Sequence, residues 1–237
     1  MMRRAAVLAA CVLLDASPAA NAGVVAVDVG HTLSAPGATS ARGRSEHAFN
    51  LELARHVVEA LRDRGLRVHL INADGMIGSL RERPAQAAGH GADLLISLHH
   101  DSVSAHELQP WTWNGELLDY NDEFAGHSVF VSRENPDLAR SELCARVIGA
   151  RLQRLGFVPT HKNARRRPYA DAMHAVHYYD GLAVLRHATM PALLFEAGVI
   201  KNRAEELLLR DAARQARMAD GIATAVAACL QVPPTAP

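Results

Sequence analysis

The sequence predicts one α/β domain with a mainly parallel, twisted sheet of about five to six strands and helices on both faces. Short apolar runs alternate with amphipathic helical patterns along most of the chain. Several of these runs are apolar at consecutive positions, which is typical of strands buried on both faces. About 215 residues remain after an N-terminal leader, a length that fits a single domain. We therefore expect one catalytic-size domain over residues 23–232, without internal repeats or a linker.

The first 22 residues have the three parts of a signal peptide. Two arginines precede an apolar run over Ala5–Leu14, which is too short to span a bilayer, and Ala20-Asn21-Ala22 offers small residues for cleavage. Leu8–Cys11 resembles a lipoprotein box, and a lipid anchor on Cys11 is the second interpretation. We expect an exported protein, located in the periplasm.

Charge and cysteine content exclude several classes of protein. Lysine plus arginine equal aspartate plus glutamate at 25 each, so no net field attracts nucleic acid or an anionic membrane. After the leader, the chain has no apolar run of transmembrane length. Cys144 and Cys229 both lie in helical apolar patterns, which favours buried thiols over a disulfide bond.

The first strand of the domain is an apolar run, Val24–Val29, that stops at Gly30 and His31. We expect Gly30 to let the backbone turn there. The following pattern, 45–64, is an amphipathic helix with Glu46 in its first turn. Taken alone, His31 is typical of a surface loop, and Glu46 of a carboxylate that the helix dipole favours.

The same strand and helix signals continue to the end of the chain. Strands are predicted over 66–71, 92–98, 127–131, 181–185 and 192–195, and helices over 80–88, 136–155, 204–210 and 212–230. The run over 92–98 is followed at once by His99, His100 and Asp101, and the run over 192–195 by Glu196. Residues 233–237, with two prolines, are expected to form a frayed tail.

Two polar segments interrupt this pattern. Residues 104–125 hold both tryptophans, and two interpretations stay open for them: a cover that contacts substrate, or a surface hairpin that packs its own aromatic side chains. Residues 159–180 are predicted as a long polar loop. Its arginine row, Arg165–Arg167, is typical of a solvated surface, and the spacing of His174 and His177 is only a weak metal signal.

The carboxyl ends of parallel strands meet at one edge of a sheet, where ligands and catalytic groups gather. His31, His99 and Glu196 follow predicted strands, and Glu46 opens the helix after the first strand. Two histidines and a carboxylate with an open fourth position form the ligand set of a catalytic zinc, and a further carboxylate can act as general base. From this pattern alone, two interpretations are about equally favoured: a metallohydrolase, and residues that meet at this edge by chance.

The order of these motifs resembles the zinc-dependent N-acetylmuramoyl-L-alanine amidases of the Amidase_3 type, which cleave peptidoglycan. The resemblance rests on Val27–His31, Glu46 with Asn50, Ser97–His99, Leu185–Arg186, and Pro191–Gly198 followed by Asn202. It implies one zinc ion per chain with His31, Glu46 and His99 as ligands, and Glu196 as the base that activates water. It also favours His99 over His100 as the ligand, since adjacent strand residues point to opposite faces.

The implied reaction is hydrolysis of the amide between N-acetylmuramic acid and L-alanine in peptidoglycan or muropeptides. Two departures concern the surroundings of the site: His100-Asp101 replaces a small residue and asparagine, and Ile71-Asn72 replaces threonine and arginine. Two other hypotheses are a zinc peptidase or amidohydrolase acting on soluble peptides, and a non-catalytic peptidoglycan-binding regulator. An activator protein is left open.

Overall fold

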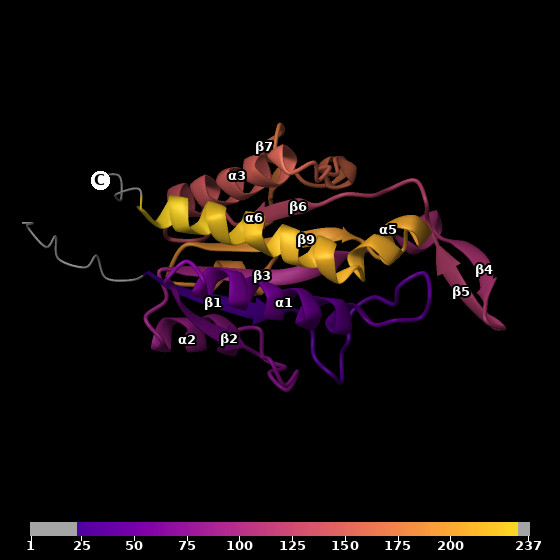
Figure 1. Ribbon diagram of the computed structural model, residues 1–237, viewed down its shortest axis with the longest axis horizontal. Coiled ribbons are helices and arrows are strands. Elements are labelled where there is room, and N and C mark those ends of the chain that lie inside the picture. Colours follow the sequence, from indigo (N-terminus) through magenta and orange to yellow (C-terminus); the bar gives the residue numbers. More distant parts are fainter. Residues whose placement is uncertain (1–22, 232–237) are drawn as a thin grey trace, which may run out of the picture.

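A seven-stranded sheet forms the centre of the computed structural model, which describes residues 23–231 (Figure 1). The predicted leader with Cys11 and the tail at 233–237 lie outside the described residues. The strand order is β2-β1-β3-β9-β6-β8-β7, where the bounds are β1 Val24–Val29, β2 Arg67–Ile71, β3 Leu94–Asp101, β6 Ser128–Val131, β7 Tyr169–Asp171, β8 Val176–Tyr178 and β9 Ala192–Val199. The β2-β1-β3-β9 half is parallel throughout, whereas β6 runs antiparallel to β9 and β7 antiparallel to β8. The predicted α/β class with a mainly parallel sheet is confirmed.

Helices cover both faces of the sheet. The helices are α1 Glu46–Arg62, α2 Glu82–Gly89, α3 Leu138–Arg154, α4 Ala183–Arg186, α5 Arg203–Leu209 and α6 Ala212–Gln231. Alternate residues of β1 serve the two faces: Val25 and Val27 pack in the core with α1, α3 and α6, while Val24 and Ala26 pack in a second cluster that includes residues of α2 and α4. In Figure 1, α1, α3 and α6 lie side by side across one face. This double cover explains why the strands are apolar at consecutive positions.

Two local predictions were wrong. The run over 181–185 forms the single helical turn α4 rather than a strand, because one turn buries Val184 and Leu185 equally well and so short a run does not distinguish the two. The polar segment 159–180 is not a plain loop. It contains the 3₁₀ turn Lys162–Arg165 and the short strands β7 and β8, which bring the sheet to seven strands.

The aromatic segment 104–125 forms a 3₁₀ turn, Ala105–Glu107, and a two-stranded hairpin of β4 Gln109–Trp113 and β5 Glu116–Tyr120. Trp111 stacks on Trp113 with ring centroids 5.5 Å apart, and its Nε1 donates to the carbonyl of Ala41 at 2.8 Å. The hairpin extends from the end of the molecule near α5 (Figure 1). The segment therefore has the structure of a surface hairpin that packs its own aromatic rings.

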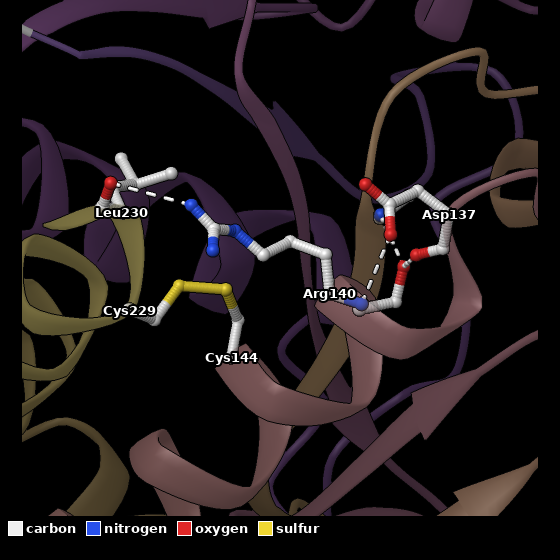
Figure 2. The surroundings of a disulfide bond; sticks show 7 residues. Asp137, Arg140, Cys144, Cys229 and Leu230 are labelled. Carbon is white, nitrogen blue, oxygen red and sulfur yellow. Dashed lines mark hydrogen bonds between the residues drawn. A yellow bond between two sulfur atoms is a disulfide. The ribbon is translucent and has the colours of Figure 1, made fainter. Parts of the chain in front are cut away.

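A disulfide bond joins Cys144 of α3 to Cys229 of α6 (Figure 2). The prediction of two free thiols was wrong. Each cysteine is buried as expected, but α3 and α6 pack against each other and bring together two positions 85 residues apart. Disulfides are typical of proteins outside the cytoplasm. Among the helices of residues 23–231, none is long and apolar enough to cross a membrane.

Candidate metal centre

His31 is separated from the end of β1 by Gly30, and it carries the backbone turn that was expected at Gly30. Its φ is 68°, a left-handed conformation that is rare for residues other than glycine. The side-chain amide of Asn72 holds this turn by donating to the carbonyls of Val29 and His31, both at 2.7 Å. The expectation for Gly30 was therefore wrong, because the neighbouring segment after β2 stabilises the strained conformation at His31 itself.

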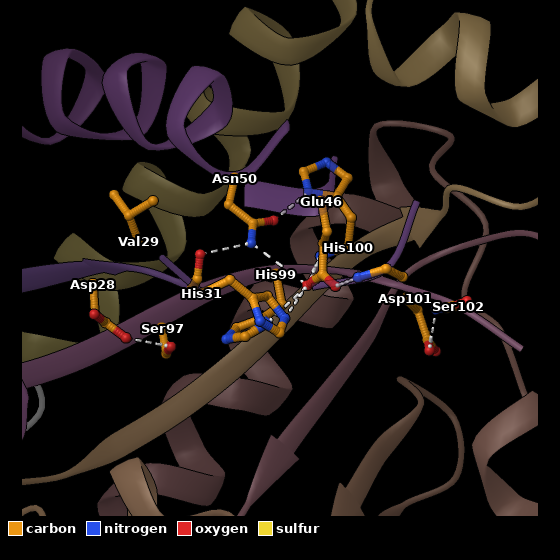
Figure 3. Close-up of polar contacts among 12 residues, drawn as sticks. Asp28, Val29, His31, Glu46, Asn50, Ser97, His99, His100, Asp101 and Ser102 are labelled. Carbon is orange, nitrogen blue, oxygen red and sulfur yellow. Dashed lines mark hydrogen bonds and ion pairs between the residues drawn. The ribbon is translucent and has the colours of Figure 1, made fainter. Parts of the chain in front are cut away.

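Glu46 lies between two imidazoles at the first turn of α1 (Figure 3). Its Oε1 is 3.0 Å from Nε2 of His31 and 2.9 Å from Nδ1 of His99, and its Oε2 accepts from the backbone of Ala38 at 3.1 Å. Burial by itself raises the pKa of this carboxyl, but the hydrogen bonds to His31 and His99 outweigh it and leave the pKa below its usual value. Glu46 is thus held ionised.

The donor atoms of His31, Glu46 and His99 all lie within 4.8 Å of one another. Two imidazole nitrogens and one carboxylate oxygen at this separation match the three protein ligands of a catalytic zinc site, which leaves a further position open. The residues present therefore fit a zinc ion. His31 and His99 remain partly exposed, so the cluster is accessible from solvent.

His100 points away from this cluster, as strand alternation predicts. Its Nδ1 lies 2.8 Å from Oδ1 of Asn50, one turn along α1 from Glu46. Asn50 also donates to the carbonyl of Gly30 at 3.2 Å. Burial lowers the pKa of His100 to about 3, so this imidazole is neutral. His100 and Asn50 together join α1 to the strand ends that carry His31 and His99.

Glu196 lies on β9 beside His99, its partner in the parallel register of β3 and β9. Its Oε2 is buried and has no hydrogen-bond partner within residues 23–231. Burial, followed by the charges of Asp101 and Glu46, raises the pKa of Glu196 well above its ordinary value. A carboxylate with a raised pKa and a free oxygen is suited to accepting a proton.

A buried ion pair beneath the centre was missed by the sequence interpretation. Nη1 of Arg83 donates to Oδ1 of Asp28 at 3.2 Å and to the carbonyl of Val29 at 2.8 Å, while Nη2 donates to the carbonyl of His31 at 2.6 Å. Ser97 donates to the other oxygen of Asp28 at 2.6 Å. The one available signal was Asp28 itself, since a carboxylate in the middle of a buried strand requires a cationic or hydrogen-bonding partner.

Other candidate residues lie elsewhere. Asp101 pairs with Lys162, accepts from the amide of Asn163 and accepts from the backbone of Ser102. His174 bonds to Asp171 in a turn, and His177 is buried in β8, so neither belongs to the three-residue cluster.

The chain is similar to two curated amidases. The chain is 26% identical to N-acetylmuramoyl-L-alanine amidase AmiA of Escherichia coli K12, over 86% of this chain and 74% of AmiA. It is also 26% identical to the amidase AmiC of Neisseria meningitidis over 86% of this chain, but it spans only about half of that protein, 51%.

A solved structure has the same fold. The catalytic domain of CwlV, an N-acetylmuramoyl-L-alanine amidase of Bacillus (Paenibacillus) polymyxa var. colistinus, matches with a TM-score of 0.68 and 26% identity, over 89% of this chain and 99% of that one. The family model described as N-acetylmuramoyl-L-alanine amidase matches residues 25–228, which is nearly all of the described domain. The chain therefore belongs to the Amidase_3 family of zinc-dependent N-acetylmuramoyl-L-alanine amidases.

Proposed function

We propose that His31, Glu46 and His99 hold one zinc ion in this amidase and that Glu196 is its general base. The observation that carries the proposal is the convergence of three ligand atoms within 4.8 Å, with Glu196 beside His99 in the sheet. The substrate is peptidoglycan or its muropeptides, and the bond hydrolysed joins N-acetylmuramic acid to L-alanine.

Bound zinc supplies a Lewis acid and a water molecule of lowered pKa, which amide hydrolysis requires near neutral pH. The protein contributes the geometry. Asn72 and Arg83 hold the carbonyl of His31, and strand β3 directs His99 to the same side. Because Glu46 lies on α1, His99 on β3, and the carbonyl of His31 is held by two side chains, little reorganisation is needed when the metal binds.

Glu196 has the features that a general base needs at this position. Its Oε2 accepts a proton from the attacking water and returns it to the departing nitrogen of L-alanine. The raised pKa of the carboxyl brings it closer to the working pH, where a base transfers protons most effectively.

The cellular location is proposed from two features. The leader at residues 1–22 predicts export, and the Cys144–Cys229 bond is compatible with an oxidising compartment. We place the enzyme in the periplasm, where its polymeric substrate lies.

The test combines metal analysis with muropeptide chemistry. Purified protein is assayed for zinc by elemental mass spectrometry and then incubated with sacculi, and the released peptides are identified by mass. We expect about one zinc per chain, intact stem peptides that begin with a free L-alanine amine, and loss of activity on chelation with recovery on adding zinc. Cleavage within the peptide instead would support a soluble-peptide peptidase. Tight binding to sacculi without any release would support a non-catalytic regulator.

A further inference from the structure

The 3₁₀ turn Lys162–Arg165 is locked to the edge of the sheet that carries the metal centre. Nζ of Lys162 donates to Oδ1 of Asp101 at 3.0 Å and to the carbonyl of Ser102 at 2.7 Å. The amide of Asn163 donates to Oδ2 of Asp101 at 2.9 Å and to Ser128 at 3.1 Å. Asp101 is only two residues beyond His99, so these bonds hold the turn close to the part of β3 that carries His99.

A cavity of about 230 Å³ lies between this turn and the segment that follows β3. Its lining residues are Asp101, Ser102, Val103, Ser104, Glu107, Lys162, Asn163, Arg165, Arg166 and Arg167. The lining is thus polar, with four cationic side chains against two carboxylates. A cavity of this size is smaller than a typical drug-sized pocket and suits one short side chain with its charged group.

Two of the four cations are already neutralised within the lining. Lys162 pairs with Asp101, and Arg165 pairs with Glu107. The guanidinium of Arg167 stacks on the ring of Tyr179 at 3.7 Å and donates to the carbonyl of Arg166 at 3.0 Å, and within residues 23–231 it has no ion pair. Arg166 has an exposed side chain without an ion pair or side-chain hydrogen bond within residues 23–231. The excess positive charge of the cavity therefore comes from Arg166 and Arg167.

We propose that Arg166 and Arg167 form a subsite for a carboxylate of the acidic peptide that departs when the amide is hydrolysed. The subsite rests on the proposed function, because it would select substrates of the centre by their peptide part. It follows the turn that Asn163 ties to Asp101 and to Ser128, and Ser128 is the partner of Glu196 in the sheet. Guanidinium groups bind carboxylates by paired, charge-assisted hydrogen bonds, and stacking on Tyr179 holds the plane of Arg167 in place beforehand. Neutral sugar rings have no charge that could pair with the two guanidinium groups, whereas a carboxylate has one.

The first test is kinetic and compares two substrates. Arg166→Gln, Arg167→Gln and the double variant are assayed on a muropeptide with free peptide carboxylates and on the same muropeptide with those carboxylates amidated. A charged hydrogen bond is worth enough to raise KM about tenfold for the free-acid substrate. We expect this rise with kcat nearly unchanged, and no comparable rise for the amidated substrate. Arg166→Lys should recover part of the loss, because it keeps the charge.

Arg67→Gln is the matched control. Arg67 is exposed at the start of β2, and β2 is parallel to β1, so this arginine lies at the edge of the sheet opposite to His31. The Arg67→Gln substitution removes one positive charge at a distance from the cavity. The KM values of this variant should equal those of the unmodified protein. Equal losses on the two substrates, or no loss for Arg166→Gln, would overturn the proposed subsite.

A binding measurement separates this proposal from the proposed function. The free tetrapeptide from sacculi is titrated calorimetrically into the Glu196→Gln protein, with and without Arg166→Gln. We expect Arg166→Gln to weaken binding of the tetrapeptide about tenfold. Added salt should weaken binding to the protein that retains Arg166. If the unmodified chain cleaves no muropeptide but this binding difference is found, the catalytic assignment fails and the subsite stands. If the unmodified chain cleaves muropeptides but no binding difference is found, the catalytic assignment stands and the subsite fails.

Discussion

A Cβ atom on Gly30 would lie 2.4 Å from Nε2 of His99, far inside van der Waals contact. Gly30 follows β1 and His99 lies on the neighbouring strand β3, and the backbone of Gly30 donates to the carbonyl of Leu98 at 3.0 Å. Only glycine leaves room for the imidazole at this position. Gly30 therefore sets the location of a proposed ligand from the adjacent strand.

Gly30→Ala should displace His99 and weaken zinc binding while the domain stays folded. Mutating the groups that hold a metal ligand in position typically lowers metal affinity by about 10- to 100-fold. Competition with a chromophoric chelator measures this, and circular dichroism reports the fold. Gly78→Ala is the control, because a Cβ there meets no atom within 4 Å. Unchanged affinity in Gly30→Ala would contradict the role of this close approach.

Glu196→Gln should retain zinc but lose amidase activity by about 100-fold or more, since the amide cannot accept the proton of the attacking water. Elemental analysis and release of stem peptide from sacculi are measured on the same sample. Glu59→Gln, an exposed position on α1, should change neither quantity. Full activity in Glu196→Gln would show that another group is the base.

Arg83→Met should lower the free energy of unfolding by about 3–5 kcal/mol, because it leaves Asp28 buried without its cation. Urea unfolding followed by circular dichroism gives the value. Arg81→Met removes the same charge from an exposed position two residues earlier and should have little effect. If the two variants were equally stable, the buried pair would not support the strand ends beneath the centre.

Removing the disulfide with Cys144→Ala and Cys229→Ala together should lower the free energy of unfolding by about 2–5 kcal/mol, because the bond closes a long loop of the unfolded chain. The two cysteines are 85 residues apart. Urea unfolding is compared with and without a reducing agent. The reductant should destabilise the unmodified protein and leave the double variant unchanged; a reductant effect of the same size in both would refute the prediction.

Acid should destabilise the fold through its buried histidines. Burial lowers the pKa of His100 to about 3 and that of His127 to about 4. Unfolded histidine titrates near 6.5, so between these values the unfolded chain binds more protons than the folded one. The contribution of these histidines to the free energy of unfolding is fully present above about pH 6.5. It falls as the pH decreases toward 4, by at most about 1.4 kcal/mol per pH unit for each histidine.

Urea unfolding at pH 7.5 and 5.5 measures this dependence. His127→Leu has a similar volume and cannot be protonated, so its stability should fall less over the same interval. An identical fall in the two proteins would show that His127 is not buried in its neutral form.

Local pattern was sufficient to predict the fold class and the positions of the four proposed site residues. His31 comes shortly after β1, His99 and Glu196 lie in the carboxyl-terminal halves of β3 and β9, and Glu46 begins α1. Strand and helix periodicity therefore places them toward one edge of a parallel sheet. Alternation along β3 likewise separates His99 from His100. These properties depend on neighbours within a few residues, which the sequence displays directly.

Long-range packing decided the rest. The Cys144–Cys229 bond depends on α3 and α6 lying side by side, the Arg83–Asp28 pair on a helix meeting a strand 55 residues away, and the left-handed backbone of His31 on Asn72 from the segment after β2. Contacts of this kind join residues that are unrelated in sequence, so no local period reveals them. The sequence by itself determined the sheet and the residues at its edge, while the tertiary structure decided which buried groups hold those residues in place.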